Sequence, residues 1–240
     1  MKILVVTREF PPHTLGGISY HLRYLYEAIA ERGHDVTVLA GRCLESKRPT
    51  TEESALDVEW FWFPTRKAYH LQVSLLIRRK LRSIPIHEYD VVALHTDYPF
   101  EVPAPSVWKI HDCSKVSRQY ERQDMSTPVR WLDTALEPSR DAVNRRSLSM
   151  ANHLIFNSGF CRTNWERFYE VGESDVILNG VDRDVFHPTE SFTTEEYVLF
   201  VGDSQRKGID DVRQFAGVSE YPVYTVGVAD SDHPRIRSLG

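Results

Sequence analysis

The chain has 240 residues, of which 41% are hydrophobic and 26% charged, so it can bury a sizeable core and is typical of a globular protein. Its formal net charge of −5 gives no electrostatic basis for nucleic-acid binding, and we expect none. Its three cysteines are far apart, no basic leader precedes an apolar stretch, and no apolar run is long enough to span a bilayer. These features predict a cytoplasmic chain without disulfides, a signal peptide or a transmembrane helix, and the cysteine spacing does not favour a metal site.

The first 42 residues predict a strand, a loop, a helix and a second strand. Residues 3–6 are an apolar, β-branched run that is typical of a buried strand. Four apolar residues then recur at helical spacing: Ile18, Leu22, Leu25 and Ile29. Gly33 stands where a glycine would cap the end of that helix, and the second strand begins at Val36. Such a crossover unit is right-handed and joins parallel strands, so we predict an α/β fold with a parallel sheet flanked by helices.

The loop before the helix carries Gly16 and Gly17. The start of a helix offers unpaired backbone N–H groups and a partial positive charge, and glycine lets a ligand come close to the backbone. Two interpretations are open: the glycines bind a phosphate group, or they only make the turn. The dinucleotide fingerprint G-x-G-x-x-G is absent, which disfavours a nicotinamide or flavin enzyme.

Strand and helix patterns alternate along the rest of the chain. Strands are predicted at 57–64, 89–95, 106–110, 151–157, 197–201 and 221–226, and helices at 69–83, within 114–150, from an N-cap at Ser158, and at 212–216. We expect the four consecutive aromatic residues at 60–63 to belong to the core. Residues 75–82 mix apolar and basic side chains, so this helix either packs with a solvated charged face or lies on an anionic membrane surface.

Two of the predicted strands run into a histidine, His95 and His111. Ligands of parallel sheets bind beyond the carboxyl ends of the strands, so both side chains are expected at the binding edge. His111 is the strongest single candidate, because an imidazole can donate, accept or carry charge near neutral pH. The alternative is a histidine that bonds only to nearby backbone. Asp112 either orients His111, contacts an acceptor or caps the next helix.

Several stretches resemble family-4 glycosyltransferases of the GT-B fold. The matching motifs are Phe10-Pro11-Pro12, Gly16-Gly17, the helix end Arg-Gly-His-Asp-Val at 32–36, and the Asn-Gly-Val-Asp turn at 179–182. The resemblance implies two Rossmann-like domains that face each other across a cleft. It implies an acceptor-side domain at 1–180, a linker at 181–195, and the incomplete start of a nucleotide-sugar domain at 196–240.

The resemblance also implies a reaction. Such enzymes move a sugar from a nucleotide diphosphate to an acceptor hydroxyl with retention, without a cofactor and without an obligatory metal. By this resemblance His111 faces the transferred sugar, and Gly16 and Gly17 approach the donor diphosphate. Arg206 and Lys207 meet the leaving group, whose growing negative charge needs fixed cations.

Further contacts and partners follow from the same resemblance. His95 and Asp112 are expected to contact the sugar or the acceptor. The partners are a nucleotide-sugar donor and a glycan or lipid-linked acceptor, in polysaccharide, glycolipid or glycoprotein glycan synthesis. A lipid-linked acceptor would bring residues 75–82 to the inner face of the membrane as a peripheral contact.

Two features depart from the family pattern. Asp203 stands where an arginine is usual, and a pair of glutamates seven residues apart, which holds the donor sugar and ribose in the family, has no counterpart. The chain therefore reads as truncated within its second domain. The alternative function is a non-catalytic acceptor-domain module or one half of a split enzyme whose donor site a second chain completes. A nucleotide-sugar epimerase of similar architecture is the weaker third interpretation.

Overall fold

The computed structural model describes residues 1–43, 54–63, 69–184, 186–188, 196–202, 207–227 and 233–239. Two residues of the expected donor loop, Asp203 and Arg206, lie outside this part of the chain. The chain forms two compact units, one of Met1–Cys113 with Leu132–Phe186 and one of Ser114–Trp131 with His187–Gly240.

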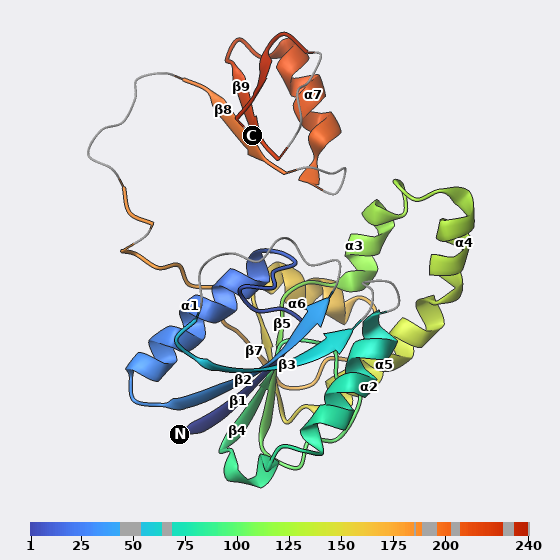
Figure 1. The fold of residues 1–240 in the computed structure, drawn as a ribbon. Helices are drawn as coiled ribbons and strands as arrows, with labels where there is room; N and C mark the ends of the chain where they lie inside the picture. The colour runs from blue at the N-terminus through green and yellow to red at the C-terminus, as the bar shows by residue number, and fades with distance from the viewer. Residues whose placement is uncertain are drawn as a thin grey trace. The chain divides into compact units, whose positions relative to one another are not determined.

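A seven-stranded sheet forms the first unit (Figure 1). Its strands are β1 (Lys2–Thr7), β2 (Asp35–Cys43), β3 (Asp57–Phe63), β4 (Val91–Leu94), β5 (Ser106–Ile110), β6 (His153–Phe156) and β7 (Ser174–Val176). They are ordered β3-β2-β1-β4-β5-β6-β7, and every neighbouring pair is parallel. The predicted α/β fold with a Rossmann-like parallel sheet is confirmed.

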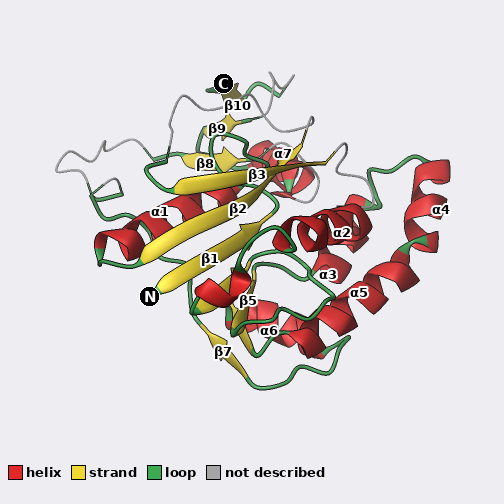
Figure 2. Cartoon of the chain, turned by 60° about the horizontal axis from the view of Figure 1, so that its bottom comes forward, coloured by secondary structure: helices red, strands yellow, loops and turns green. Residues whose placement is uncertain are grey.

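Helices cover both faces of this sheet (Figures 1 and 2). On one face, α1 (Gly17–Glu31) buries Leu22 and Tyr26 against a core that includes Val5 of β1. The other face carries α2 (Tyr69–Leu81), α5 (Glu137–Met150) and α6 (Gly159–Glu166), and a short 3-10 turn, η1 (Ile86–Glu88), precedes β4. Trp108 of β5 points to this second face, since its ring packs edge-on against Trp165 of α6 with 5.5 Å between centroids.

Local signals in the sequence set the helix ends as predicted. Gly33 follows α1 with a φ of 86°, a left-handed conformation that favours glycine, and its N–H bonds to the carbonyl of Ala30. Ser158 caps α6, where its hydroxyl accepts a hydrogen bond from the N–H of Cys161 at 3.1 Å. Both predictions are confirmed. They could be made from the sequence because a cap depends on residues that are close together in the chain.

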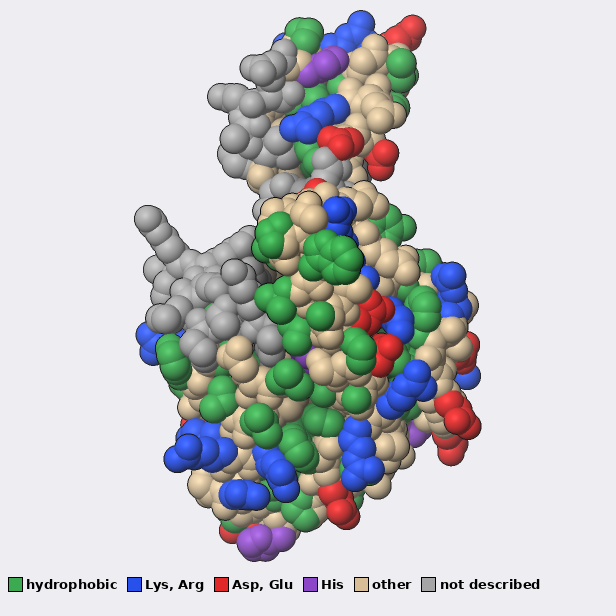
Figure 3. All heavy atoms as spheres, turned by 90° about the vertical axis from the view of Figure 1, so that its right-hand side faces the viewer, with side chains coloured by type: hydrophobic (Ala, Val, Ile, Leu, Met, Phe, Trp, Pro, Cys, Tyr) green, Lys and Arg blue, Asp and Glu red, His purple; other side chains and the backbone are tan. Residues whose placement is uncertain are grey.

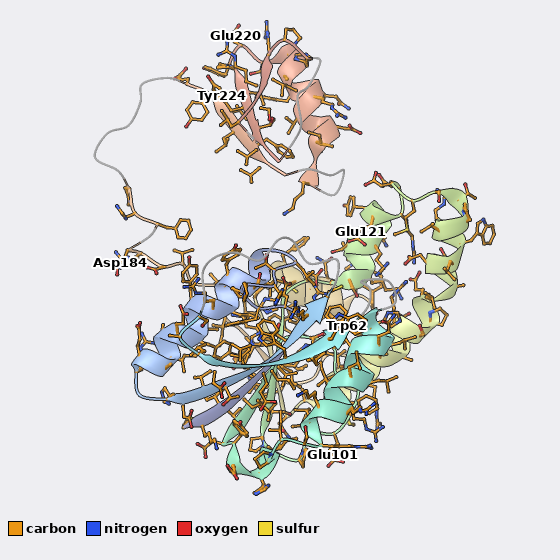
Figure 4. All side chains as sticks on the ribbon, in the orientation of Figure 1. Trp62, Glu101, Glu121, Asp184, Glu220 and Tyr224 are labelled. Carbon is orange, nitrogen blue, oxygen red and sulfur yellow. The ribbon has the colours of Figure 1, made fainter. Side chains whose placement is uncertain are left out.

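The prediction that residues 60–63 are all core is wrong for Trp62. Phe61 and Phe63 are buried, but 53% of Trp62 is exposed (Figure 4). Successive side chains of a strand point to opposite faces, so Trp62 lies opposite Phe61 and Phe63 on β3, the edge strand of the sheet. Trp60 shares the face of Trp62 but packs partly against the core. Composition identified the strand, but it did not identify the buried face.

The second unit contains a small parallel sheet. Its strands are β8 (Val198–Val201), β9 (Val223–Val226) and β10 (Ile236–Ser238), with β9 in the centre, and α7 (Ile209–Val218) joins β8 to β9. Two more helices precede them in the chain, α3 (Ser114–Glu121) and α4 (Thr127–Ala135), and the division between the units falls inside α4. The sequence did not predict β7 or β10, since three residues are too few to display a period. It also placed α7 too short, at 212–216.

Candidate functional site

The loop between β1 and α1 is built around a buried carboxylate. Glu9 is only 2% exposed, and its Oε2 accepts hydrogen bonds from the N–H groups of Leu15 at 2.7 Å and Gly16 at 2.8 Å. The amide of Gly16 is therefore already used within the protein. The N-cap of α1 has no side-chain hydrogen bond, and its first turn carries no acidic residue. The N–H groups that follow Gly16 thus keep the positive end of the helix open to an anion.

The two glycines of this loop are not required by the packing of the chain. A Cβ atom added at Gly16 or Gly17 would meet nothing within 4 Å, and Gly16 has extended backbone with a φ of −170°. Gly41 of β2 is different, because a Cβ there would lie 2.6 Å from the carbonyl oxygen of Arg8. The open space beside Gly16 and Gly17 suits the approach of a ligand to the backbone.

A chain of hydrogen bonds joins α1 to the ends of two strands. The hydroxyl of Tyr26 lies 2.6 Å from Nε2 of His95, and Nδ1 of His95 lies 3.0 Å from Nε2 of His111. The register of the sheet sets this contact, since the N–H of His95 donates to the carbonyl of Val6 in β1 at 2.8 Å. His95 is 7% exposed and both of its ring nitrogens are engaged.

The direction of this chain follows from counting protons. His95 is the one hydrogen-bond partner of the Tyr26 hydroxyl among the described residues, so the phenol donates its proton to His95. His95 then carries its own proton on Nδ1 and donates it to Nε2 of His111. A neutral His111 consequently holds its proton on Nδ1, and this buried atom has no partner among the described residues.

Two further side chains extend the cluster. His21 of α1 stands over His111 with 6.0 Å between ring centroids, and its Nε2 lies 3.4 Å from Nζ of Lys109. Burial, together with the nearby Lys109 cation, lowers the pKa of His111 to about 3 and that of His21 to about 4. Burial also holds the pKa of His95 well below its usual value. The cluster therefore has neutral imidazoles at pH 7.

Backbone contacts fix the segment that follows β5. Asn157 donates from Nδ2 to the carbonyl of His111 at 2.7 Å, and the indole of Trp165 donates to the carbonyl of Asp112 at 2.9 Å. The Asp112 side chain is exposed. Neither ring nitrogen of His111 is bonded to it, because Nε2 meets His95 and Nδ1 has no partner among the described residues. Asp112 thus does not orient the His111 ring through a hydrogen bond.

The structure brings together part of the predicted set. His95 and His111 touch, and Gly17 lies one helical turn before His21, which packs on His111. Lys207 is an exposed residue of the second unit, just before Gly208, the N-cap of α7 with a φ of 87°. Arg206 lies outside the described residues.

Four residues of the cluster and its loop were missed by the sequence analysis: Glu9, His21, Tyr26 and Lys109. One signal was available, since Lys109 is a charged residue two places before His111 inside an otherwise apolar strand. His21 and Tyr26 show nothing unusual within an amphipathic helix. Their roles depend on partners at least 69 residues away in the chain.

Residues 15–185 match the sequence profile of Glycosyltransferase Family 4. The chain belongs to this family. The family match covers Gly16 and Gly17, the histidine cluster and the whole of the sheet after β1. Among the described residues, no group of three or more His, Cys, Asp or Glu side chains is placed to hold a metal ion. No helix within the described ranges is both long and apolar enough to cross a membrane.

Curated relatives of this glycosyltransferase include glycogen synthases of two Mycobacterium tuberculosis strains, CDC 1551 / Oshkosh and H37Rv. Each is 28% identical over 236 residues, an alignment covering 88% of this chain and 56% of the relative. An uncharacterized glycosyltransferase of Methanocaldococcus jannaschii, MJ1607, is 28% identical over 96 residues, 40% of this chain and 25% of that protein. The chain thus spans about half the length, or less, of the curated relatives it matches.

Solved structures share the fold. An alpha-glucosyltransferase in complex with UDP and a 13-mer DNA with a central A:G mismatch aligns with a TM-score of 0.52 at 12% identity. This match covers 96% of this chain and 57% of that one. A second complex, with UDP and DNA containing an HMU base, gives a TM-score of 0.50 at 11% identity, over 97% and 58% of the two chains. These likenesses support the GT-B type of fold.

Proposed function

We propose that this glycosyltransferase moves a hexose, with retention, from a nucleotide-diphosphate sugar to an acceptor hydroxyl. The observation that carries the proposal is the joint position of two features at the carboxyl ends of β1, β4 and β5. An open helix start with unobstructed glycines lies one turn from a cluster of neutral histidines. The first suits a diphosphate and the second suits the uncharged hydroxyl groups of a sugar.

Each group in the proposed site has a chemical task. The N–H groups at the start of α1, from Gly17 onward, bind donor phosphate oxygens, and His111 faces the transferred sugar. The bond from the anomeric carbon to the diphosphate breaks, a bond to the acceptor oxygen forms, and the acceptor proton leaves with the released diphosphate. Lys207, with Arg206, stabilises the charge that develops on this leaving group. Fixed donors and cations meet this charge, so the scheme needs no metal ion or cofactor.

The names of the relatives favour a hexose as the transferred group, because two of them are glycogen synthases. The acceptor is then a glycan or a lipid-linked sugar, in a cytoplasmic reaction. We also propose the domain limits that the resemblance implied, 1–180, 181–195 and 196–240.

A lipid-linked acceptor would fit the surface of α2. Its Leu75 is 58% exposed, and Arg78, Arg79 and Arg82 are exposed beside it or just beyond its end, while Ile77 is buried. Basic and hydrophobic side chains mix on the face of the molecule drawn in Figure 3. This arrangement supports a peripheral contact with an anionic membrane through residues 75–82. It also supports the packing alternative, since the opposite side of α2 belongs to the core.

The substitution Gly17→Ala tests the diphosphate site, with Gly159→Ala as a matched control. Each glycine is the first residue of a helix, follows an extended N-cap, and would place a Cβ in open space. Both variants should fold with stability changes of about 1 kcal/mol or less. Gly17→Ala should weaken binding of UDP or ADP about tenfold or more, and hexosyl transfer should fall with it.

The outcome distinguishes the enzyme from its alternative. Equal binding of the nucleotide by both variants would contradict the phosphate role of the loop. Binding without transfer from any nucleotide hexose would favour the non-catalytic or split-enzyme interpretation.

A further inference from the structure

Lys109 is a buried lysine on whose charge no carboxylate of the described residues acts. It is 8% exposed, and its Nζ has a single polar partner among the described residues, the neutral Nε2 of His21 at 3.4 Å. Burial lowers the pKa of Lys109, and no carboxylate of the described chain acts to raise it. Lysine is seldom buried without a partner, because removal of a charge from water is costly. Among the described residues, no ion pair of Lys109 offsets this desolvation cost.

The position of Lys109 explains where such a charge acts. Lys109 and His111 are two residues apart in or just after β5, so both point to the face that α1 covers, whereas Trp108 points to α6. His21, which contacts both side chains, is one turn after Gly17. Lys109 thus lies beneath the first turns of α1, on the side where the glycine loop opens.

Cations and carboxylates both lie near the cluster. Arg8, at the end of β1, and Lys109 both act on His111 through their charges, and the start of α1 adds a partial positive charge. Arg8 has acidic neighbours of its own, since Glu9 lies 3.9 Å from it and its charge also acts on Asp97. No carboxylate among the described residues acts on Lys109, so its charge is the one that remains for a ligand.

We propose that Lys109, with His21 beside it, binds an anionic oxygen group, a phosphate or carboxylate, of the ligand in the transfer site. An anion would supply the missing countercharge and give the lysine the charge-assisted hydrogen bond that its neutral neighbour does not. Only one part of this assignment rests on the proposed sugar transfer, namely the molecule from which the anionic group comes. The group comes either from the donor diphosphate or from an acidic or phosphorylated acceptor, and these share one chemistry.

Calorimetric binding to the protein and its Lys109→Met variant tests the assignment. UDP and ADP probe the donor as the source. Glucose 6-phosphate and glucuronate, with uncharged glucose as reference, probe the acceptor. Lys2→Met is the charge control, since it removes one lysine from the opposite end of the same sheet, where Lys2 pairs with Glu88 at 2.9 Å. Lys109→Gln is a second neutral variant if the methionine disturbs folding, and Lys109→Arg retains the cation.

We expect Lys109→Met to bind at least one anionic probe about tenfold or more weakly. Lys109→Arg and Lys2→Met should bind the same probe as tightly as the unsubstituted protein does. The melting temperature of the Lys109→Met variant should stay the same or rise, because this substitution removes an uncompensated buried charge. Two results would overturn the assignment. In one, the unsubstituted protein binds none of the anionic probes; in the other, both neutral variants bind all of them as tightly as the unsubstituted protein does. Lys109-dependent binding without hexosyl transfer would leave the anion site intact and contradict the proposed function instead.

Discussion

At the scale of single residues, burial controls the chemistry of the histidine cluster. His95 is enclosed and bonded at both ring nitrogens, so its ring is fixed between Tyr26 and His111. Burial and the charge of Lys109 keep His21 and His111 neutral. A neutral imidazole can form hydrogen bonds with uncharged hydroxyl groups, and it does not compete with Lys109 for an anion.

Because His21 and His111 are neutral in the folded protein, they make the free energy of unfolding depend on pH. The pKa is about 4 for folded His21 and about 3 for folded His111, against 6.5 in an unfolded chain. At these two groups the unfolded chain therefore binds more protons between pH 6.5 and about 3, so their contribution to stability is complete above pH 6.5 and falls as the pH falls through this range. Asp97 acts in the opposite direction, because burial raises its folded pKa from 3.8 to about 6. Urea unfolding of a His21→Gln/His111→Gln variant should show a smaller loss between pH 7.5 and 4.5 than the unsubstituted protein. His87→Gln, at an exposed position, should show the same loss, and identical slopes for all three proteins would disprove the explanation.

At the scale of one element, the carboxylate of Glu9 ties the β1–α1 loop to the start of its helix. The carboxylate of Glu9 accepts two loop amides, so the loop has its conformation before a ligand arrives. A loop that is already ordered loses less conformational entropy when it binds. Glu9 thus positions the start of α1, although it offers no group to a phosphate.

The substitution Glu9→Ala should reveal this positioning. It leaves two amides without their acceptor, at a cost of about 1–3 kcal/mol, whereas Glu9→Gln retains one acceptor oxygen and should lose less. Urea unfolding measures both losses, and nucleotide binding should weaken in the same order. Glu166→Ala is the control, because its exposed ion pair with Arg162 at 2.8 Å should contribute less than about 1 kcal/mol. A loss at Glu9 no larger than at Glu166 would show that the loop does not need this carboxylate.

At the scale of the whole molecule, the two units differ in how well they are covered. Helices lie on both faces of the seven-stranded sheet, as buried parallel strands require. In the three-stranded sheet, Ala216 of α7 and Val223 of β9 form a small core, and the flanking Leu199 and Val201 of β8 are 51% and 64% exposed. We therefore expect the two units to open with different free energies.

Hydrogen exchange should separate the units. The amides of β8 and β9 should exchange at least about tenfold faster than those of β1 and β5, a difference of about 1.4 kcal/mol in opening free energy. The physical reason is the smaller apolar area that the three-stranded sheet buries. Equal protection in the two sheets would mean that they open as one cooperative body.

Sequence alone determined what depends on neighbouring residues. Periodicity gave the parallel α/β sheet, glycine and serine gave the ends of α1 and α6, and the strand ends pointed to His95 and His111. Only the tertiary structure decided that Tyr26 meets His95 and that His21 meets Lys109, residues that are 69 and 88 positions apart. These contacts follow from the register of β1 against β4 and β4 against β5, which backbone hydrogen bonds and buried side chains fix together. Composition could identify the buried strands, but the cluster exists because their register aligns His95 and His111 beneath α1.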